Sequence, residues 1–317
     1  MADLAKKLCR FLRDKDYRFL VLDRHGFTKP LSDKAHIKKM FHARMGYYPD
    51  LKDPKTFSEK LQWLKLHDRN PAYCGMVDKY AAKKFVAGVI GEKYIIPTYA
   101  VWDRVEEIDF SALPEQFVLK CTHDCGSLIV CRDKSAFDAE AAKKKLRACL
   151  KKNYYWQSRE WPYKHVKPRI IAEKFMSDDA EDGEAAAKSE LTDYKFLCFN
   201  GVVKCLNVCT DRFSGDGLKV TYFDRAWNRL PFERYYPASQ SPIEKPENFD
   251  VMIELAERLG RGIPLVRIDF YEIRGRVYFG EMTFFPGSGM EPFKPAEWDR
   301  ILGDDLRLPG RATGGGV

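Results

Sequence analysis

The chain has 317 residues, of which 45% are hydrophobic and 32% charged, and a formal net charge of +8 at pH 7. This length and mix predict a soluble protein with two or three subdomains and a sizeable core. No segment approaches the ~18 apolar residues that a membrane-spanning helix needs, so a helical membrane span is excluded.

The positive charge suits an anionic partner, such as nucleotide phosphates, an acidic polysaccharide, nucleic acid or anionic lipid. The basic residues are spread along the chain, without a dense arginine tract or a recognisable nucleic-acid-binding motif. We therefore expect a small-molecule or saccharide substrate and no nucleic-acid partner. The sequence leaves the oligomeric state open.

The first fifteen residues are charged and lack the apolar stretch of a secretory signal, so we expect a cytoplasmic protein. Leu4, Leu8, Phe11 and Leu12 can share one face of a basic helix. Such a face suits either a short helix docked on the protein, which we favour, or a peripheral contact with the inner face of the membrane.

The chain contains nine cysteines. In a long chain without an export signal, this number favours reduced thiols over disulfides. Two cysteine pairs have CxxxC spacing, unlike the CxxC spacing of a zinc knuckle, so we predict no structural zinc site.

Residues 1–75 are predicted to form a mostly helical N-terminal region. Residues 31–70 have a helical pattern that is interrupted at Asp53-Pro54. Thr56 followed by Glu59 is the pattern of a capping box, which marks the start of a helix.

Residues 76–170 are predicted to form a small subdomain. Asp78 precedes a helical segment that ends at Gly91, and a short strand is expected around 94–96. The stretch 117–131 predicts a hairpin: strand 117–121, a polar loop 122–127 and strand 128–131. An amphipathic helix is expected over 135–152.

Residues 171–308 are predicted to form a second subdomain, followed by a disordered tail at 309–317. Its first strand runs into an acidic, alanine-rich loop, 178–190, which we expect to be mobile. Asn200-Gly201 is a strong hairpin-turn signal. A helix over 247–260 precedes a further hairpin, so the expected fold class is α+β with antiparallel sheets. The chain has neither a GxGxxG nor a Walker-A motif.

The late hairpin, "RIDFYEIRGRVYFGEMTFFPGSG" (267–289), carries Asp269 and Glu281 between apolar neighbours, where an unpaired charge is costly. A three-residue turn, Arg274-Gly275-Arg276, would place the two carboxylates directly opposite each other. A divalent cation would then explain the pair, because Mg²⁺ binds one or two carboxylates plus substrate phosphates. Two alternatives stay open: a two-residue turn would separate the carboxylates, and Glu281 could instead pair with a nearby arginine.

Lys120 lies on the strand "FVLKC", whose alternation puts it on the face opposite Leu119, and the strand leads into the loop "THDCGS". A lysine beside a loop of backbone N–H groups is what phosphate oxygens need. The alternative is a surface lysine before an ordinary turn.

Several segments occur in the order typical of the ATP-grasp superfamily: "VDKYAAKKFV", "FVLKCTHDCGS", "IIAEKFM", "DYKFLCFNG" and "VRIDFYEIRGRVYFGEMTFFPGSG". More specifically, the chain resembles the TupA-like ATP-grasp proteins encoded with capsule and teichuronopeptide genes, over residues 33–308. "DPKTFSEKLQWLKLHDRNP" and "REWPYKHVKPRIIAEKF" are specific to that family. The resemblance implies an ATP-grasp fold, in which the antiparallel sheets of two subdomains clamp ATP.

The resemblance also implies the nucleotide-binding residues. Lys79 or Lys83 would be the first lysine to contact ATP, and Lys120 would bind the α- and β-phosphates. The hinge Glu173, Lys174 and Met176 would hold the adenine, and Asp193 and Lys195 would contact the ribose side and a phosphate.

The same resemblance implies a catalytic centre. Asp269 and Glu281 would bind Mg²⁺, and Arg267 would stabilise the transferred phosphoryl group. Ser288 and Gly289 would help to hold the acceptor.

Two positions depart from the superfamily pattern. The phosphate loop has one glycine where relatives usually have two or three. Thr283 replaces the asparagine that many members use as a metal ligand, so the sequence does not decide whether Thr283 takes part in the site. The sequence likewise does not decide whether His123, in the phosphate loop, takes part in the site.

The implied reaction is an ADP-forming ligation of a carboxylate and an amine through an acyl phosphate. The TupA-like resemblance suggests that an amino acid or peptide is joined to a uronic acid of a surface polysaccharide. The aromatic and basic segment 153–169 would suit a sugar acid, or could equally pack between subdomains. The alternatives are a glycosyltransferase of the same pathway, hinted at by the acidic "SDDAED", and a non-catalytic ATP- or polysaccharide-binding module.

Overall fold

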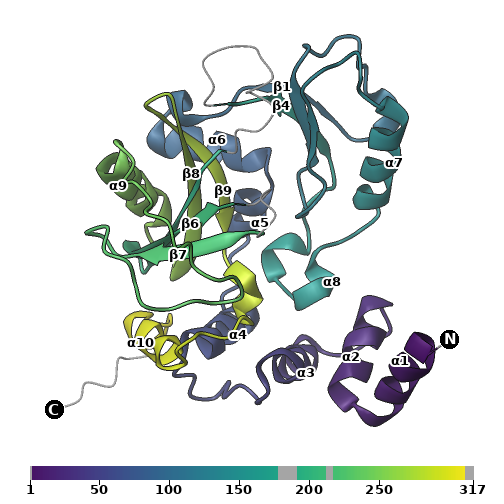
Figure 1. The fold of residues 1–317 in the computed structure, drawn as a ribbon, viewed down its shortest axis with the longest axis vertical. Helices are drawn as coiled ribbons and strands as arrows, with labels where there is room; N and C mark the ends of the chain where they lie inside the picture. Colours follow the sequence, from purple (N-terminus) through teal and green to yellow (C-terminus); the bar gives the residue numbers. More distant parts are fainter. Residues whose placement is uncertain (1, 178–190, 212–216, 311–317) are drawn as a thin grey trace.

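Two antiparallel sheets lie next to each other in the computed structural model of the chain, with helices packed around them (Figure 1). The structure describes residues 2–177, 191–211 and 217–310. The loop expected to be mobile, 178–190, and most of the expected tail lie outside these residues.

Six α-helices precede the first strand, and the remaining α-helices of the described residues lie between and after the strands. The α-helices are α1 (Ala2–Arg13), α2 (Lys15–Arg24), α3 (Asp33–Met45), α4 (Phe57–His67), α5 (Ala72–Val77), α6 (Ala81–Ile90), α7 (Ala139–Leu150), α8 (Tyr155–Ser158), α9 (Phe249–Gly260) and α10 (Glu297–Asp305). The short 3-10 helices are η1 (Glu92–Tyr94), η2 (Val105–Glu107), η3 (Trp161–Tyr163) and η5 (Pro286–Gly289).

The first sheet has the order β1-β4-β2-β3, and the second has the order β7-β6-β5-β8-β9. The strands are β1 (Thr98–Trp102), β2 (Phe117–Cys121), β3 (Ile129–Cys131), β4 (Ile170–Lys174), β5 (Asp193–Phe199), β6 (Val202–Thr210), β7 (Lys219–Phe223), β8 (Leu265–Ile273) and β9 (Arg276–Thr283). Every pairing between these strands is antiparallel, so the predicted α+β class is confirmed. Because β4 lies between β1 and β2, the first sheet extends past the boundary expected at residue 170.

Local sequence signals explain several element boundaries. The Thr56 side chain accepts from the Glu59 backbone N–H and the Glu59 carboxylate reaches back, so the predicted capping box starts α4. Asp78 accepts hydrogen bonds from the backbone of Tyr80 and Ala81, immediately before α6. The helix stops at Gly91, whose φ of 111° suits glycine.

The prediction of a strand around residues 94–96 is wrong. Residues 92–94 form the 3-10 helix η1, and β1 begins only at Thr98. Pro97 precedes that strand and has no N–H to donate to a sheet ladder, which delays the start of pairing. β7 and α10 were not predicted at all.

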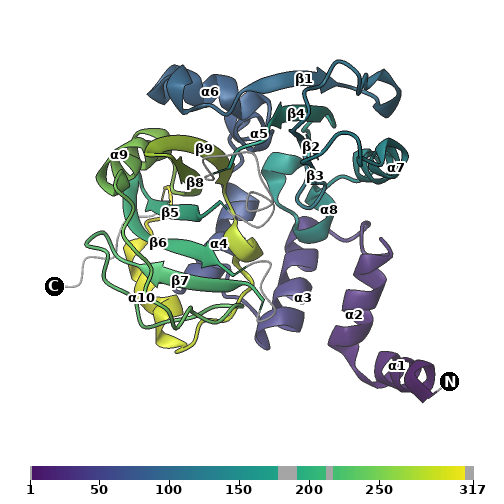
Figure 2. The same cartoon turned by 45° about the horizontal axis from the view of Figure 1, so that its top comes forward.

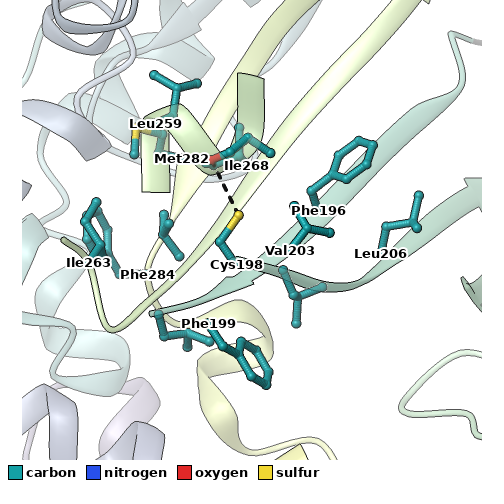
Figure 3. Packing of buried hydrophobic residues seen from close by; sticks show 14 of the residues in the cluster. Phe196, Cys198, Phe199, Val203, Leu206, Leu259, Ile263, Ile268, Met282 and Phe284 are labelled. Atoms are coloured by element: carbon teal, nitrogen blue, oxygen red, sulfur yellow. Dashed lines mark hydrogen bonds between the residues drawn. The ribbon is translucent and has the colours of Figure 1, made fainter. Parts of the chain in front are cut away.

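The largest core of the described residues contains side chains of α9 and the second sheet, together with side chains of α4, α5 and α6 (Figure 3). Cys198 of β5 is part of it, and its thiol donates to the carbonyl oxygen of Ala256 at 3.5 Å. A Cβ on Gly260 would lie 3.0 Å from the Cβ of Cys198, so glycine permits the close approach of α9 to the sheet. All nine cysteines are free thiols, as predicted.

Helices α1 and α2 form a pair at one end of the molecule, away from both sheets (Figure 1; Figure 2). No residue of α2 is buried, although Phe19 and Leu20 pack against Met40 and Phe41 of α3. None of the helices in the described part of the chain combines the length and the apolar composition that crossing a membrane requires.

Candidate functional site

A buried carboxylate on the first sheet holds two of the predicted lysines. The alternation of β2 puts Lys120 on the face opposite Leu119, as its sequence indicated. The Lys120 Nζ lies 2.5 Å from one oxygen of Glu173, and the Lys83 Nζ lies 2.5 Å from the other. We call Lys83, Lys120 and Glu173 the lysine cluster. It carries a surplus of one positive charge.

Lys79 and Lys83, between which the sequence did not choose, have different surroundings. Lys83 also donates to the carbonyl oxygen of Ile96, at 2.7 Å, and to the hydroxyl of Thr98, at 2.8 Å. Lys79 instead donates to the carbonyl oxygen of Asp124, inside the predicted phosphate loop. The two lysines therefore stand at different points around one site.

The predicted phosphate loop, 122–127, is held by its own side chains. The Ser127 hydroxyl donates to Asp124 at 2.5 Å and accepts from the backbone N–H of Cys121 at 2.7 Å. The His123 imidazole is buried, and its Nε2 lies 3.1 Å from the carbonyl oxygen of Lys152. Since a carbonyl only accepts, Nε2 is the protonated nitrogen, and His123 ties the loop to the end of α7.

The predicted hinge lies at the end of β4. Glu173 is buried and acts as counter-ion to two lysines in this structure, while the side chain of Lys174 is exposed. The Lys174 backbone N–H donates to Pro97, which fixes the strand end. Met176 is half-buried, directly before the undescribed segment.

The second sheet brings the remaining predicted charges together, in what we call the arginine cluster. Arg267 donates to both oxygens of Asp269, at 2.7 and 2.8 Å, and to Glu281 at 2.8 Å. Lys195, paired with Asp269 across the sheet, approaches it at 2.5 Å and Asp193 at 3.1 Å. Three carboxylates face two cations here, so the cluster carries a surplus of one negative charge.

The hairpin that carries Asp269 and Glu281 differs from its prediction. Ile273 pairs with Arg276, so the turn has two residues, Arg274 and Gly275, and the predicted three-residue turn is wrong. Both turn residues have positive φ, of 51° and 69°, as in the favoured two-residue hairpin turns.

A bulge corrects the register farther along the same hairpin. Phe270 pairs with Phe279 but Ile268 pairs with Met282, so Gly280 and Glu281 together oppose Asp269. A Cβ on Gly280 would lie 3.2 Å from the Asp269 carbonyl oxygen. The bulge therefore returns Glu281 to the face of Asp269, and one guanidinium reaches both carboxylates.

Cations of both sheets act on Glu281. Burial works to raise its pKa, but the surrounding cations outweigh burial and lower the pKa from 4.5 to about 2. In decreasing order of effect, these cations are Arg267, Lys79, Lys195 and Lys120. Burial and cations oppose each other in the same way at Glu173, where Lys120 and Lys83 lower the pKa. Lys120 of the first sheet and Lys79, just before α6, thus act on a carboxylate of the second sheet.

Two cavities flank Arg267. One, of about 210 Å³, extends from Lys195 to Arg234 and Tyr235 over the second sheet. The other, of about 280 Å³, lies between Glu281 and the loop that contains Ser288. The arginine therefore separates two spaces in which ligands could lie, and it contacts both.

The predicted acceptor residues Ser288 and Gly289 are fixed by a buried polar network that the sequence did not reveal. The Ser288 hydroxyl donates to Glu160 at 2.6 Å and accepts from the Lys65 Nζ at 3.0 Å. The Gln62 amide donates to the Ser288 and Gly289 carbonyl oxygens, at 3.1 and 3.0 Å. The only local signal of this network is a lysine between two leucines in α4.

Burial shifts the pKa values of the two charged members of this network in opposite directions. It lowers the pKa of Lys65 to about 7 and raises that of Glu160. Their mutual attraction opposes both shifts.

The aromatic segment 153–169 is largely occupied within the protein. Tyr155 and Tyr163 are buried in the main core. Arg159 is buried and donates to the carbonyl oxygens of Thr28 and Lys29. These side chains are therefore packed within the protein, which is the second of the two alternatives that the sequence left open.

The basic residues that follow are also paired. Lys167 pairs with Asp103 at 2.6 Å, and Arg169 pairs with Asp78 at 3.2 Å. Both cations therefore have acidic partners within the protein.

The model of one protein family, described as TupA-like ATP-grasp, matches residues 59–307. The chain belongs to the TupA-like ATP-grasp family. The match contains the two charged clusters and the loop around Ser288. It begins inside α4, after the capping Thr56. No curated protein matches this family member in sequence.

Solved structures that resemble this TupA-like protein include D-alanine–D-alanine ligase from Helicobacter pylori, at 13% identity and a TM-score of 0.38, covering 79% of this chain and 69% of that one. A RimK domain ATP-grasp protein from Sphaerobacter thermophilus has 13% identity and a TM-score of 0.38, covering 74% and 69%. The ATP-grasp ligase PsnB complexed with a minimal precursor has 10% identity and a TM-score of 0.38, covering 72% of this chain. The match spans 58% of that last structure, which is less than two thirds of its length.

Proposed function

We propose that this ATP-grasp protein is an ADP-forming ligase that joins a carboxylate to an amine. The observation that carries the proposal is the arrangement of charge: Lys120 of the first sheet, Lys79 just before α6, and Arg267 and Lys195 of the second sheet all act on the Glu281 carboxylate. A magnesium–nucleotide complex combines anionic phosphates with a cation. It therefore complements both the positive surplus of the lysine cluster and the negative surplus of the arginine cluster.

The nucleotide would lie between the two clusters. Lys79, Lys83, Lys120 and Lys195 would neutralise the phosphates, and Asp193 would contact the ribose. The segment from Glu173 through Lys174 to Met176 would hold the base through its backbone. Glu173 keeps Lys83 and Lys120 in place by pairing with both.

The residues present fit a magnesium ion. Asp269 and Glu281 converge on one cationic group, and carboxylate oxygens are ligands that Mg²⁺ prefers. In the described part of the chain, no three His, Cys, Asp or Glu side chains form a metal site. We propose that the phosphates would supply further ligands. Bound there, Mg²⁺ would offset phosphate charge. The Thr283 hydroxyl donates to Glu281 at 3.2 Å and would orient that ligand.

The reaction would proceed in two displacements. A carboxylate oxygen of the substrate attacks the γ-phosphorus of ATP, the bond to the bridging oxygen breaks, and ADP leaves. The amine nitrogen then attacks the acyl carbon, phosphate leaves, and the amine loses a proton. Arg267 would stabilise the negative charge that develops at both centres. Ser288 and Gly289 would position the acceptor in the adjoining cavity.

For the substrates, we propose a uronic acid of a surface polysaccharide or its precursor and an amino acid or peptide. This choice rests on the family resemblance and on the net positive charge of the chain. The "SDDAED" segment, on which the glycosyltransferase alternative was based, lies mostly outside the described residues, and no contact among the described residues favours that alternative.

The test is a panel of uronic acids crossed with amino acids, incubated with the purified protein and Mg-ATP. We expect ADP and phosphate to be released for one combination, with an amide product identified by mass spectrometry. AMP with pyrophosphate, or UDP released from a nucleotide sugar, would overturn the proposed reaction class. ATP binding without turnover of any combination would favour a binding module.

A further inference from the structure

Helix α1 presents an apolar stripe that nothing in the described structure covers. Leu4, Leu8 and Leu12 recur every four residues and therefore share one face of the helix. They are 75%, 60% and 65% exposed. Folding normally buries such a stripe against another element. The predicted docking of this face on the protein is not observed.

The opposite side of the same helix is basic. Lys6, Arg10 and Arg13 lie on the side away from the leucine stripe, because successive residues are turned by about 100° in a helix of 3.6 residues per turn, and Lys7 lies at the edge of the stripe. Residues 4–13 contain no acidic side chain, and Asp3 precedes them. Apolar and basic halves on one helix are the pattern of a segment that lies in a membrane surface.

The position of the helix leaves both halves accessible. Figure 1 and Figure 2 both show α1 at the outer end of the α1–α2 pair, far from the sheets. Every residue from Leu4 to Arg10 is exposed. The salt bridge of Arg10 with Asp14, at 3.3 Å, is itself on the surface. A flat partner could therefore reach the whole stripe without displacing any part of the protein.

The positive charge of α1 favours one of the partners that could cover the leucine stripe. A second copy of the chain would bring two basic helices together, and their like charges would repel. A bilayer containing anionic lipid would instead bury the leucines and attract the lysines and arginines. We propose that α1 binds the surface of an anionic lipid bilayer. This inference is independent of the proposed ligase reaction.

The experiment uses the full chain and sedimentation with vesicles of phosphatidylcholine, either alone or mixed with phosphatidylglycerol. The test variant combines Leu4→Gln, Leu8→Gln and Leu12→Gln. The matched control combines Val202→Gln, Val251→Gln and Ile301→Gln, three exposed apolar residues on other elements. Because the leucines are exposed, the test variant should unfold at the same temperature as the wild type.

We expect the wild type and the control to sediment with the mixed vesicles and not with phosphatidylcholine alone. The test variant should bind at least about tenfold more weakly, and added salt should release the wild type, since both contributions to interfacial binding are needed. Equal sedimentation of the test variant, or no binding of the wild type, would overturn the proposal. Self-association without lipid that the leucine variant abolishes would assign the stripe to a second copy instead.

Discussion

The lysine cluster and the arginine cluster are built in opposite ways from the same kinds of groups. In the first, one carboxylate, Glu173, stands between two lysines. In the second, one guanidinium, Arg267, stands between two carboxylates, and Lys195 and Asp193 extend the row. The central group in each cluster holds like charges together. The flanking groups are those that a nucleotide and its metal would engage, so a central and a flanking substitution should have different effects.

The largest effect is expected from the central Arg267→Met substitution. It leaves the buried carboxylate of Asp269 beside Glu281 with Lys195 as its remaining cation, and breaking such a pair typically costs about 3–5 kcal/mol. The free energy of unfolding in urea should fall by about this amount, while Arg276→Met, an exposed arginine on the same hairpin, should leave it unchanged. Equal stability of the two variants would show that Arg267 is not the centre of the cluster.

The flanking substitution Glu281→Gln should affect function more than folding. Arg267 keeps both bonds to Asp269, so the fold should survive, whereas turnover of Mg-ATP should fall on the order of a hundredfold through loss of charge stabilisation. The measurements are ADP release and the magnesium dependence of ATP binding, with the exposed Glu244→Gln as control. An unchanged magnesium dependence would contradict the assignment of Glu281 as a metal ligand.

On the other sheet, Lys120→Ala should weaken ATP binding about tenfold, which corresponds to about 1.4 kcal/mol. Glu173 retains Lys83, so the strand should stay in place. Calorimetry on this variant and on Lys144→Ala, an exposed lysine of α7, separates a phosphate contact from a general loss of positive charge. If both variants bind ATP as tightly as the wild type, Lys120 has no phosphate role.

The smallest effect concerns acid stability. The folded pKa of Glu281, about 2, lies below its ordinary value of 4.5, so its contribution to stability is complete above pH 4.5 and disappears as the pH falls towards 2. One third of the side chain is exposed, and solvent screening reduces the contribution to about 1–2 kcal/mol. Unfolding measured across this range should show a shallower decline for Glu281→Gln than for the wild type. If the free energy of unfolding falls equally with pH in both proteins, the surrounding cations do not lower the pKa of Glu281.

The sequence predicted best the features that depend on neighbouring residues. The Asn200-Gly201 turn, with φ of 50° and 84°, joins β5 and β6 as expected. The capping box at Thr56 and the alternation around Lys120 depend equally on a few adjacent positions. In each case, the backbone geometry admits few residue types, so the local pattern decides the structure.

Features that depend on distant contacts were not predictable from the sequence. The bulge at Gly280 depends on packing against Asp269 and Tyr271, and no local signal fixes its position. Lys65 contacts Ser288 across 223 residues, and Ser288 contacts Glu160 across 128. The family resemblance identified the charged residues, but it did not indicate that they neutralise one another in two clusters.

Helix α4 makes the beginning and the end of the chain depend on each other. Gln62 and Lys65 bind the loop around Ser288, while Lys60 donates to the carbonyl oxygens of Gly303 and Leu306. During synthesis, the side chains of Lys60, Gln62 and Lys65 stay hydrogen-bonded to water until the segment that contains their partners has left the ribosome. The cavity beside Ser288 should accordingly be among the last parts to assemble, and a fragment starting at residue 59 would lack the threonine that caps its own supporting helix.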